Sequence, residues 1–374
     1  MEIQTEAPAD SAESSTRFAA AQSVLTEAIA ARAFPGCAFG VFAEGRVVLQ
    51  AALGRFTYDQ STPQVLPQAV FDIASVTKVA ATTAAAMLLY QRGLLDIDML
   101  LGDLLPGFIV GREPGSPARQ ITLRHLLAHN SGLPGYVEFF RTQTTPAELF
   151  RACLELPVEA LPGTRAEYSD PGFILLGKAI EVITGEPLAN WVDREVFKPL
   201  EMADTGFCPR LSARSMIPPT EQDDQLRFRI VQGEVQDENA YILRGVAGHA
   251  GVFSNVRDML RFSAEILSAA GHPSVSQPAR LFRRETVELF AERQAPPGSD
   301  RALGWDTPGE TSSSGTHFSS HSIGHLGYSG CSLWIDLDAG VAVVLLTNRT
   351  WPDRQSQLIR QVRPAFHDAV REAL

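Results

Sequence analysis

Segments with the pattern of β-strands occur near both ends of the chain, while helical patterns occupy the middle. Near the start, residues 36–56 (GCAFGVFAEGRVVLQAALGRF) predict two apolar strands joined by a hairpin turn at Glu44-Gly45. Near the end, residues 332–349 (SLWIDLDAGVAVVLLTNR) predict two more apolar strands around a turn at 338–340 (Asp-Ala-Gly). Because strands and helices are grouped rather than alternating, the sequence predicts an α+β fold. Its antiparallel sheet is made from both chain ends and is flanked by helices.

The length of the chain and the positions of the helical patterns predict a division into domains. At about 100–200 residues per domain, 374 residues indicate two structural units. We expect a disordered, acidic and polar tail over residues 1–15, and an α/β sheet domain formed by residues 16–70 and 290–374. Residues 71–289 are expected to form a mostly helical inserted domain, with the active site between the two domains.

The charge and the hydropathy of the chain limit its partners and its location. The net charge of −11 argues against nucleic acid and anionic membranes as main partners, because both attract basic surfaces. No apolar run approaches the ~18 residues of a membrane-spanning helix, so we expect no membrane span. The start lacks the basic-then-apolar pattern of a secretion signal. This favours a cytoplasmic protein, or a periplasmic or secreted one if a leader was removed.

The segment DIASVTKVAATTAAAMLLY (residues 72–90) places a hydroxyl and an amine in an otherwise apolar helical pattern. Ser75 and Lys78 are three residues apart, so a helix would place them on the same face. A serine hydroxyl becomes a nucleophile when a base lies within hydrogen-bonding distance. A lysine within an apolar helix is desolvated and therefore loses its proton more readily. The alternative is that Ser75 is an ordinary helix N-cap and that the spacing is due to chance.

Four further segments follow in order and give this pair a context. They are ITLRHLLAHNSGL (121–133), PGTRAEYSDPGFILLGKAIEVITG (162–185), AGHAGVFS (247–254) and IGHLGYSGCSLWIDLDAGVAVVLLTNR (323–349). Together with ASVTK around Ser75, this ordered set resembles the serine beta-lactamase and penicillin-binding-protein superfamily. The likeness is strongest to its class-C-like branch of beta-lactamase-related esterases and DD-peptidase-like hydrolases. The resemblance covers roughly residues 20–370.

The resemblance implies an acyl-enzyme mechanism. Ser75 would attack a carbonyl carbon and Lys78 would act as its general base. The YSD segment matches the family's Tyr-x-Asn or Tyr-x-Asp box, in which Tyr168 would relay the proton to the leaving group and later activate water. A phenol is useful as a base only if nearby cations lower its pKa well below ~10. Because a carboxylate at Asp170 would raise the pKa of Lys78, both Lys78 and Tyr168 remain candidates for the base, as one coupled unit.

The resemblance also assigns HLG at 325–327 to the third box of the family, usually Lys-Thr-Gly or a His-x-Gly variant. This box should form a strand edge that lines the site, with Gly327 beside the substrate. His325 would take the place of the cation, and a buried structural histidine is the alternative. The backbone N–H of Tyr328 would form the oxyanion hole together with the N–H of Ser75.

Two departures from the family pattern bear on the substrate. Leu326 stands where members that process beta-lactams carry a hydroxyl for the substrate carboxylate, and leucine cannot form a hydrogen bond. Asp170 stands where Asn commonly donates an amide N–H to the substrate. We therefore expect a serine hydrolase that is mainly an esterase for a small-molecule ester or amide, with at most weak beta-lactamase activity. The alternatives are a beta-lactamase or D-alanyl-D-alanine carboxypeptidase, and a non-hydrolytic penicillin-binding or sensor module.

Neither a metal nor an organic cofactor is implied by the resemblance. His125 and His129 are four residues apart, a spacing that can bind zinc when both lie on one helix. The HExxH glutamate is missing between them, and the sequence holds no further cluster of ligands near them. We therefore predict that the protein has no metal site.

Overall fold

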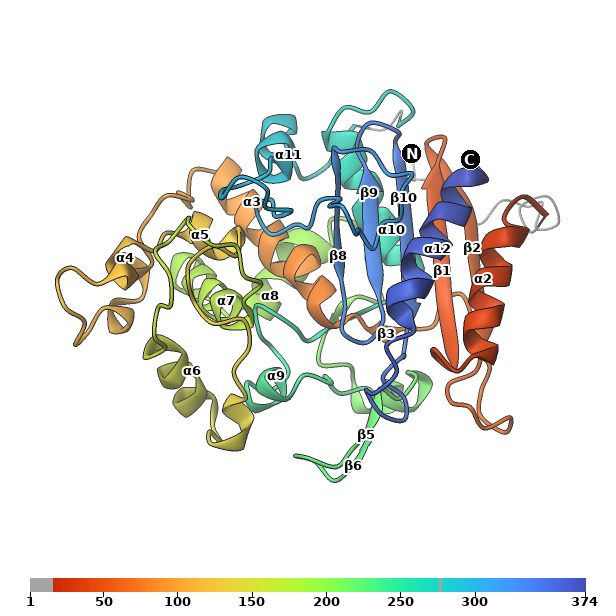
Figure 1. Cartoon of the computed structure of the whole chain (residues 1–374), viewed down its shortest axis with the longest axis horizontal. Helices are drawn as coiled ribbons and strands as arrows, with labels where there is room; N and C mark the ends of the chain where they lie inside the picture. The colour runs from red at the N-terminus through yellow and green to blue at the C-terminus, as the bar shows by residue number, and fades with distance from the viewer. Residues whose placement is uncertain (1–15, 276–277) are drawn as a thin grey trace.

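The main sheet contains five strands in the order β2-β1-β10-β9-β8, as Figure 1 shows. The computed structural model describes residues 16–275 and 278–374, so the predicted tail over residues 1–15 lies outside the described residues. The strands are β1 (Gly36–Ala43), β2 (Arg46–Gly54), β8 (Ser322–Leu326), β9 (Ser332–Asp336) and β10 (Val341–Thr347). All four neighbouring pairs are antiparallel, and Cys37 of β1 lies opposite Thr347 of β10. The predicted antiparallel sheet from both chain ends is therefore confirmed.

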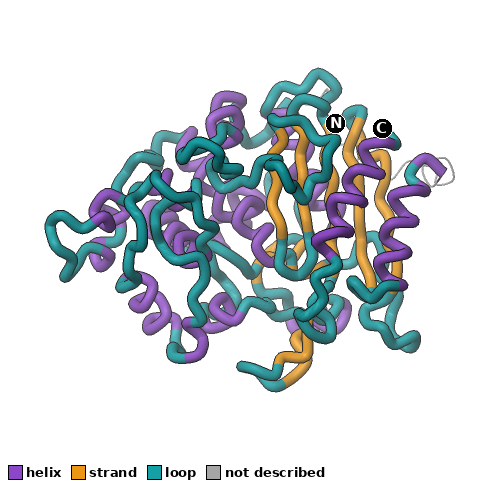
Figure 2. The backbone as a smooth tube through the Cα atoms, viewed as in Figure 1, coloured by secondary structure: helices purple, strands orange, loops and turns teal. Residues whose placement is uncertain are grey.

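Helices cover both faces of this sheet. Helices α2 (Ala19–Ala30) and α12 (Ile359–Glu372) lie side by side on one face, and α10 (Val256–Ala269) packs against β1 and β10 on the other (Figures 1 and 2). Successive residues of a strand point to opposite faces. Phe39 accordingly packs with the α2 and α12 side, while Ala38 packs with the α10 side. Because both faces are covered, every residue of β1 is buried.

Helix α10 lies within residues 71–289, the range that we predicted as the helical domain, yet it packs on the sheet. The close contact is possible because β1 has a glycine there. A Cβ built on Gly40 would lie 2.5 Å from a methyl group of Val256 in α10. The division into domains stays a prediction, and this packing shows that the sheet draws one of its covering helices from the middle of the chain.

The remaining helices form the second part of the molecule, on the side of β8 in Figure 1. They are α3 (Ala84–Gln91), α4 (Leu101–Leu104), α5 (Leu123–Leu127), α6 (Pro146–Leu154), α7 (Asp170–Thr184), α8 (Leu188–Val192), α9 (Glu238–Ile242) and α11 (Arg284–Ala291). Two small antiparallel sheets accompany them, with the strands β3 (Phe71–Asp72), β4 (Gly206–Phe207), β5 (Glu221–Asp223), β6 (Arg229–Val231) and β7 (Val252–Ser254). Helix α7 contacts α5, α6 and α8 and is mostly buried. In the described part of the chain, no helix has the length and apolar character needed to cross a membrane.

Candidate active site

Ser75 lies in a short 3-10 turn, Ala74–Val76, directly after strand β3. Ala74 has a left-handed backbone conformation with φ of 46°, which is uncommon for a residue that has a Cβ. The carboxylate of Asp72 stabilises this turn, because its Oδ1 accepts a hydrogen bond from the Ala74 N–H at 2.8 Å. Between residues 71 and 89, Ser75 is the only residue that is not buried. The turn therefore presents the Ser75 side chain to solvent from an otherwise buried segment.

The helix after Ser75 differs from the continuous helix that the sequence predicts. Residues Lys78–Thr83 form a π-helical segment before α3 begins. Two hydrogen bonds tie this segment and the residue before it to a neighbouring stretch of chain. The Thr77 Oγ1 accepts from the Val252 N–H at 3.0 Å, and the Thr82 Oγ1 donates to the Gly248 carbonyl at 2.6 Å. Short π-helical segments are frequent at functional sites, and this one carries Lys78.

The Lys78 ammonium or amine group contacts three other parts of the chain. Its Nζ lies 3.1 Å from the Ser75 Oγ and 2.6 Å from the Asp170 Oδ1. It also donates to the His249 carbonyl at 3.1 Å. The Lys78 side chain is fully buried. Hydrogen bonds to Asp170 and to the His249 carbonyl therefore hold the Lys78 Nζ next to the Ser75 oxygen.

Burial lowers the pKa of Lys78 below its usual value, and the Asp170 carboxylate opposes this effect. Desolvation disfavours the charged form of an amine, while an opposite charge within about 4–6 Å favours it. The sequence left the balance between these two effects open. In the structure burial is the larger effect, which favours the neutral amine that a general base requires.

Tyr168 reaches the site from the loop that precedes α7. His129 supports this loop, because its Nδ1 accepts a hydrogen bond from the Ser169 N–H at 2.9 Å. The His129 ring also lies 4.6 Å from the Tyr168 ring, centroid to centroid. The Tyr168 ring centroid is 4.7 Å from the Lys78 Nζ, and the interaction of Tyr168 with Ser75 lowers the pKa of the phenol. The structure thus brings Ser75, Lys78 and Tyr168 together.

The pKa of Tyr168 is raised well above its usual value, first by burial and then by the nearby Asp170 carboxylate. The interaction with Ser75 and the charge of Arg301 lower this pKa, but by less. The condition under which Tyr168 would serve as the base, a pKa lowered by nearby cations, is therefore not met. A phenol in this state keeps its proton near neutral pH, so Tyr168 can donate or relay a proton more readily than it can act as the first base.

The third box lies on strand β8 at one edge of the main sheet, next to the turn that holds Ser75. His325 is buried; its Nδ1 donates to the Leu326 carbonyl at 2.8 Å, and its Nε2 has no hydrogen-bond partner among the described residues. Burial lowers the pKa of His325 to about 4. The imidazole is therefore neutral near pH 7, unlike the cation whose place it was expected to take.

Gly327 explains how closely the end of β8 approaches the segment that carries Ser75. A Cβ on Gly327 would lie 2.5 Å from the Ile73 carbonyl oxygen, so any side chain here would separate the two segments. Two residues further on, the Ser329 Oγ donates to the Asp72 carbonyl at 2.8 Å and holds the same two segments together.

The two backbone N–H groups expected to form the oxyanion hole are available. Within residues 16–275 and 278–374, neither the Ser75 N–H nor the Tyr328 N–H donates to a protein acceptor. The Tyr328 side chain is half exposed and its carbonyl accepts from the Arg349 Nε at 2.8 Å. Arg363 of α12 donates to the carbonyls of Gly327 and Cys331 at 2.6 and 2.7 Å, so it supports the loop that carries Tyr328.

Three residues near the site were not predicted from the sequence: Asp72, His129 and Arg363. Each acts on the main chain of a site segment and not on the reacting atoms. Asp72 and Arg363 carry no motif of their own, and His129 was considered only as a metal ligand. In the sequence, Arg363 is recognisable only as a charged residue in an amphipathic terminal helix. This pattern does not reveal its partners.

The described residues contain no group of three or more His, Cys, Asp or Glu side chains that could hold a metal ion. The two histidines with metal-binding spacing have other partners. The His125 Nδ1 accepts a hydrogen bond from the Thr122 N–H at 3.1 Å, in the N-terminal cap of α5. His129 accepts from Ser169, as described above.

Two known proteins are similar to this chain over most of its length. An N-acetylmuramyl-L-alanine amidase of Bacillus subtilis is 32% identical over 375 residues, which cover 91% of this chain and 83% of that protein. A putative D-alanyl-D-alanine carboxypeptidase of Salmonella typhi is 30% identical over 351 residues, which cover 84% of this chain and 79% of the relative.

Solved structures and a family model agree with these relatives. EstCE1, a hydrolase with promiscuous acyltransferase activity, superposes with a TM-score of 0.75 at 22% identity, covering 96% of this chain and all of that one. A structural likeness at this identity supports the fold. The beta-lactamase family model matches residues 21–364. The chain therefore belongs to the beta-lactamase family, a family of hydrolases that typically use a catalytic serine.

Proposed function

We propose that the protein is an esterase that works through an acyl-enzyme on Ser75. The observation that carries this proposal is the state of the cations around the site. Among the residues that the structure describes, the three arginines nearest to the rings of Tyr168 and Tyr328 are already engaged. Their partners are Asp306 for Arg301, the carbonyls of Tyr328 and Ser356 for Arg349, and Glu221 and Glu238 for Arg354.

This pairing disfavours substrates that bring a carboxylate close to the reacting carbonyl. Penicillins and peptides that end in D-alanine carry such a group. In this site His325 is neutral and Leu326 has no hydroxyl. Arg301 and Arg354 are paired with carboxylates, and the buried Arg349 donates to carbonyls. A carboxylate that lost its water here would remain without a compensating partner, which is costly. An uncharged ester has no such cost.

In the proposed mechanism, the neutral amine of Lys78 accepts the proton of the Ser75 hydroxyl while the Oγ bonds to the ester carbonyl carbon. The negative charge that develops on the carbonyl oxygen is stabilised by the N–H groups of Ser75 and Tyr328. The ammonium form of Lys78 is stabilised by the Asp170 carboxylate, 2.6 Å away. The bond to the leaving alcohol then breaks. The phenol of Tyr168 donates its proton to the alcohol oxygen and receives the proton of the Lys78 ammonium in return. A water molecule then gives up a proton in the same way and attacks the acyl carbonyl carbon. The bond to the Ser75 Oγ breaks, the Oγ takes a proton back, and the acid is released.

Two relatives of the chain are named for other substrates, an amidase and a putative D-alanyl-D-alanine carboxypeptidase. Cleavage of an amide or a D-alanyl peptide through the same Ser75 acyl-enzyme is therefore the second candidate. The two candidates share the nucleophile and differ in whether the site accepts a substrate carboxylate.

A comparison of three substrates tests the proposal. We expect kcat/KM for p-nitrophenyl butyrate to exceed the values for nitrocefin and for a diacetyl-lysyl-D-alanyl-D-alanine peptide by about 10- to 150-fold, because one missing charged hydrogen bond costs about 1.5–3 kcal/mol. Intact-mass detection of labelling by a fluorophosphonate, with Ser75→Ala as the control, reports the nucleophile. Rapid nitrocefin or peptide turnover without ester turnover would show that the substrate class is wrong.

A change at Asp170 tests the role of its ion pair. In Asp170→Asn the carboxylate that raises the pKa of Lys78 is absent, while burial remains. The pKa of Lys78 should decrease, so the ascending part of the kcat/KM–pH profile should move to lower pH. The measurement is this profile between pH 4.5 and 9 in parent and variant. A shift to higher pH, or no shift, would contradict the assignment of Lys78 as the titrating base.

A further inference from the structure

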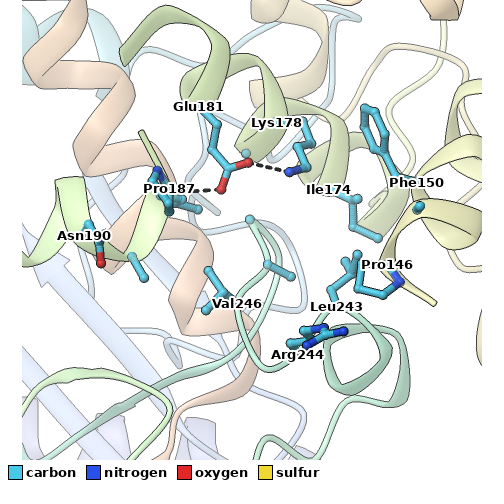
Figure 3. Close-up of a pocket in the computed structure, with 16 residues that line it drawn as sticks. Pro146, Phe150, Ile174, Lys178, Glu181, Pro187, Asn190, Leu243, Arg244 and Val246 are labelled. Carbon is cyan, nitrogen blue, oxygen red and sulfur yellow. Dashed lines mark hydrogen bonds and ion pairs between the residues drawn. The ribbon is translucent and has the colours of Figure 1, made fainter. Parts of the chain in front are cut away.

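A cavity lies beside helix α7, away from the residues of the candidate active site. It has a volume of about 470 Å³, within the range of roughly 300–1,000 Å³ that is typical of small-molecule sites. Figure 3 shows it between α6, α7, the start of α8 and the segment 243–248. Most of its lining is apolar, and includes Phe150, Ile174, Leu188, Leu243 and Val246. None of the residues that line it belongs to the candidate active site.

The charged groups at this cavity differ in whether they have a partner. Lys178 and Glu181 on α7 form an ion pair of 2.6 Å, and the second Glu181 oxygen accepts from the Leu188 N–H at 3.0 Å. Arg244 lies on the other side of the cavity from Glu181 (Figure 3) and is exposed. Its guanidinium group makes no hydrogen bond or ion pair within residues 16–275 and 278–374. The cavity thus combines an apolar interior with one uncompensated positive charge at its edge.

We propose that this cavity binds a small apolar monocarboxylate, with its hydrocarbon part among the apolar side chains and its carboxylate at Arg244. Guanidinium groups bind carboxylates with two parallel hydrogen bonds. The Glu181 carboxylate does not oppose this arrangement, because Lys178 already neutralises it. Burial of the hydrocarbon part supplies the main favourable free energy, and Arg244 selects the charged end group.

The walls of the cavity continue into two of the contacts of Lys78. Helix α7, which supplies Ile174 and Lys178, begins at Asp170, the ion-pair partner of Lys78. The segment that ends at Gly248 leads directly to His249, whose carbonyl accepts from Lys78. A ligand in the cavity would therefore contact the same elements that hold Lys78 in place. This connection rests on the proposed function, whereas binding of the carboxylate does not.

Isothermal titration calorimetry with hexanoate, heptanoate and octanoate tests binding without any turnover. Each methylene that enters the cavity should lower Kd about fourfold, which corresponds to about 0.8 kcal/mol per CH₂. Octanamide, which has the same length and no charge, should bind about two- to fivefold more weakly than octanoate, as expected for an exposed ion pair. The difference between octanoate and octanamide should decrease as salt is added.

Three variants locate the site. Arg244→Asn should remove the preference for octanoate over octanamide; asparagine tolerates the left-handed backbone of this residue, whose φ is 63°. Arg360→Gln, an exposed arginine on the distant helix α12, is the matched control and should keep the preference. Ala147→Trp, at an exposed position that lines the cavity, should fill it and abolish binding. The Tm of each variant shows whether it is folded.

The outcomes separate the parts of the proposal. Absence of saturable binding, or binding that Ala147→Trp leaves unchanged, overturns the cavity as a ligand site. Equal binding of octanoate and octanamide overturns the carboxylate as the ligand class. Because no measurement in this series depends on Ser75, a failed esterase assay leaves these results intact, and the reverse also holds.

Discussion

Replacing Lys78 by alanine should lower kcat/KM for p-nitrophenyl butyrate by about 10⁴-fold, since general-base activation of a serine contributes on this order. The reason lies in its contacts: the Lys78 Nζ is 3.1 Å from the Ser75 Oγ, and its pKa is lowered by burial. In the parent protein, kcat/KM should rise as the pH rises through this lowered pKa, because the neutral amine is the active form, and should then level off. His325, with a pKa of about 4, should not titrate in this range.

Two comparisons make this result specific. The double variant Ser75→Ala/Lys78→Ala should be no slower than Ser75→Ala alone, because groups that act as one unit are not additive. Tyr168→Phe should lose less activity, about 10²- to 10³-fold, and should keep the ascending pH limb, because its phenol stays protonated. If the limb disappears in Tyr168→Phe and persists in Lys78→Ala, then Tyr168 and not Lys78 is the base.

Replacing Arg363 by methionine should destabilise the protein by about 3 kcal/mol, because it leaves buried main-chain carbonyls without a donor. Arg363 is buried and donates to Gly327 and Cys331 at 2.6 and 2.7 Å, and to Gly330 at 3.3 Å. Its three acceptors lie on both sides of Tyr328, whose N–H is half of the proposed oxyanion hole. We therefore also expect kcat to decrease by about 10²-fold, the cost of losing one oxyanion donor.

The Arg363 experiment needs a control that separates loss of stability from loss of geometry. Arg360→Gln lies on the same helix, is exposed and should change neither the free energy of unfolding nor kcat by more than a small factor. In Arg363→Met, measured well below its Tm, kcat should decrease while KM changes little, because the N–H stabilises charge that develops only in the transition state. A stability loss with unchanged kcat would mean that the loop keeps its geometry without this arginine.

The sequence predicts the sheet well because each strand and each hairpin turn is recognisable from neighbouring residues alone. The two hairpins around residues 44–45 and 338–340 have clear turn residues, and their apolar runs pair as predicted. The residues from Asp353 onward do not extend the terminal helix, because α12 begins only at Ile359. Asp353 instead accepts a hydrogen bond from the Gln355 N–H at 2.9 Å, a local turn that competes with the helix.

The site was predictable where chemistry is carried by motif residues and not where it depends on packing. Ser75, Lys78 and Tyr168 were found by their motifs, although what each of them does in a reaction stays a prediction. The direction of the pKa changes at Tyr168 and His325 depends on how much water each group loses, which no sequence pattern shows. The same holds for Arg363, whose partners are main-chain carbonyls 32 to 36 residues away.

The pairing of β1 with β10 brings the first and last helices of the described chain into direct contact, so that Arg17 Nε donates to the Ala373 carbonyl at 2.8 Å. A short glycine-serine peptide could therefore join residue 374 to residue 16, and new termini could be opened in the exposed stretch at Pro114-Gly115. Such a circular permutant would begin in the helical part and fold the sheet from one continuous stretch of chain. It would turn the long-range pairing of the natural order into a local one, which should speed folding.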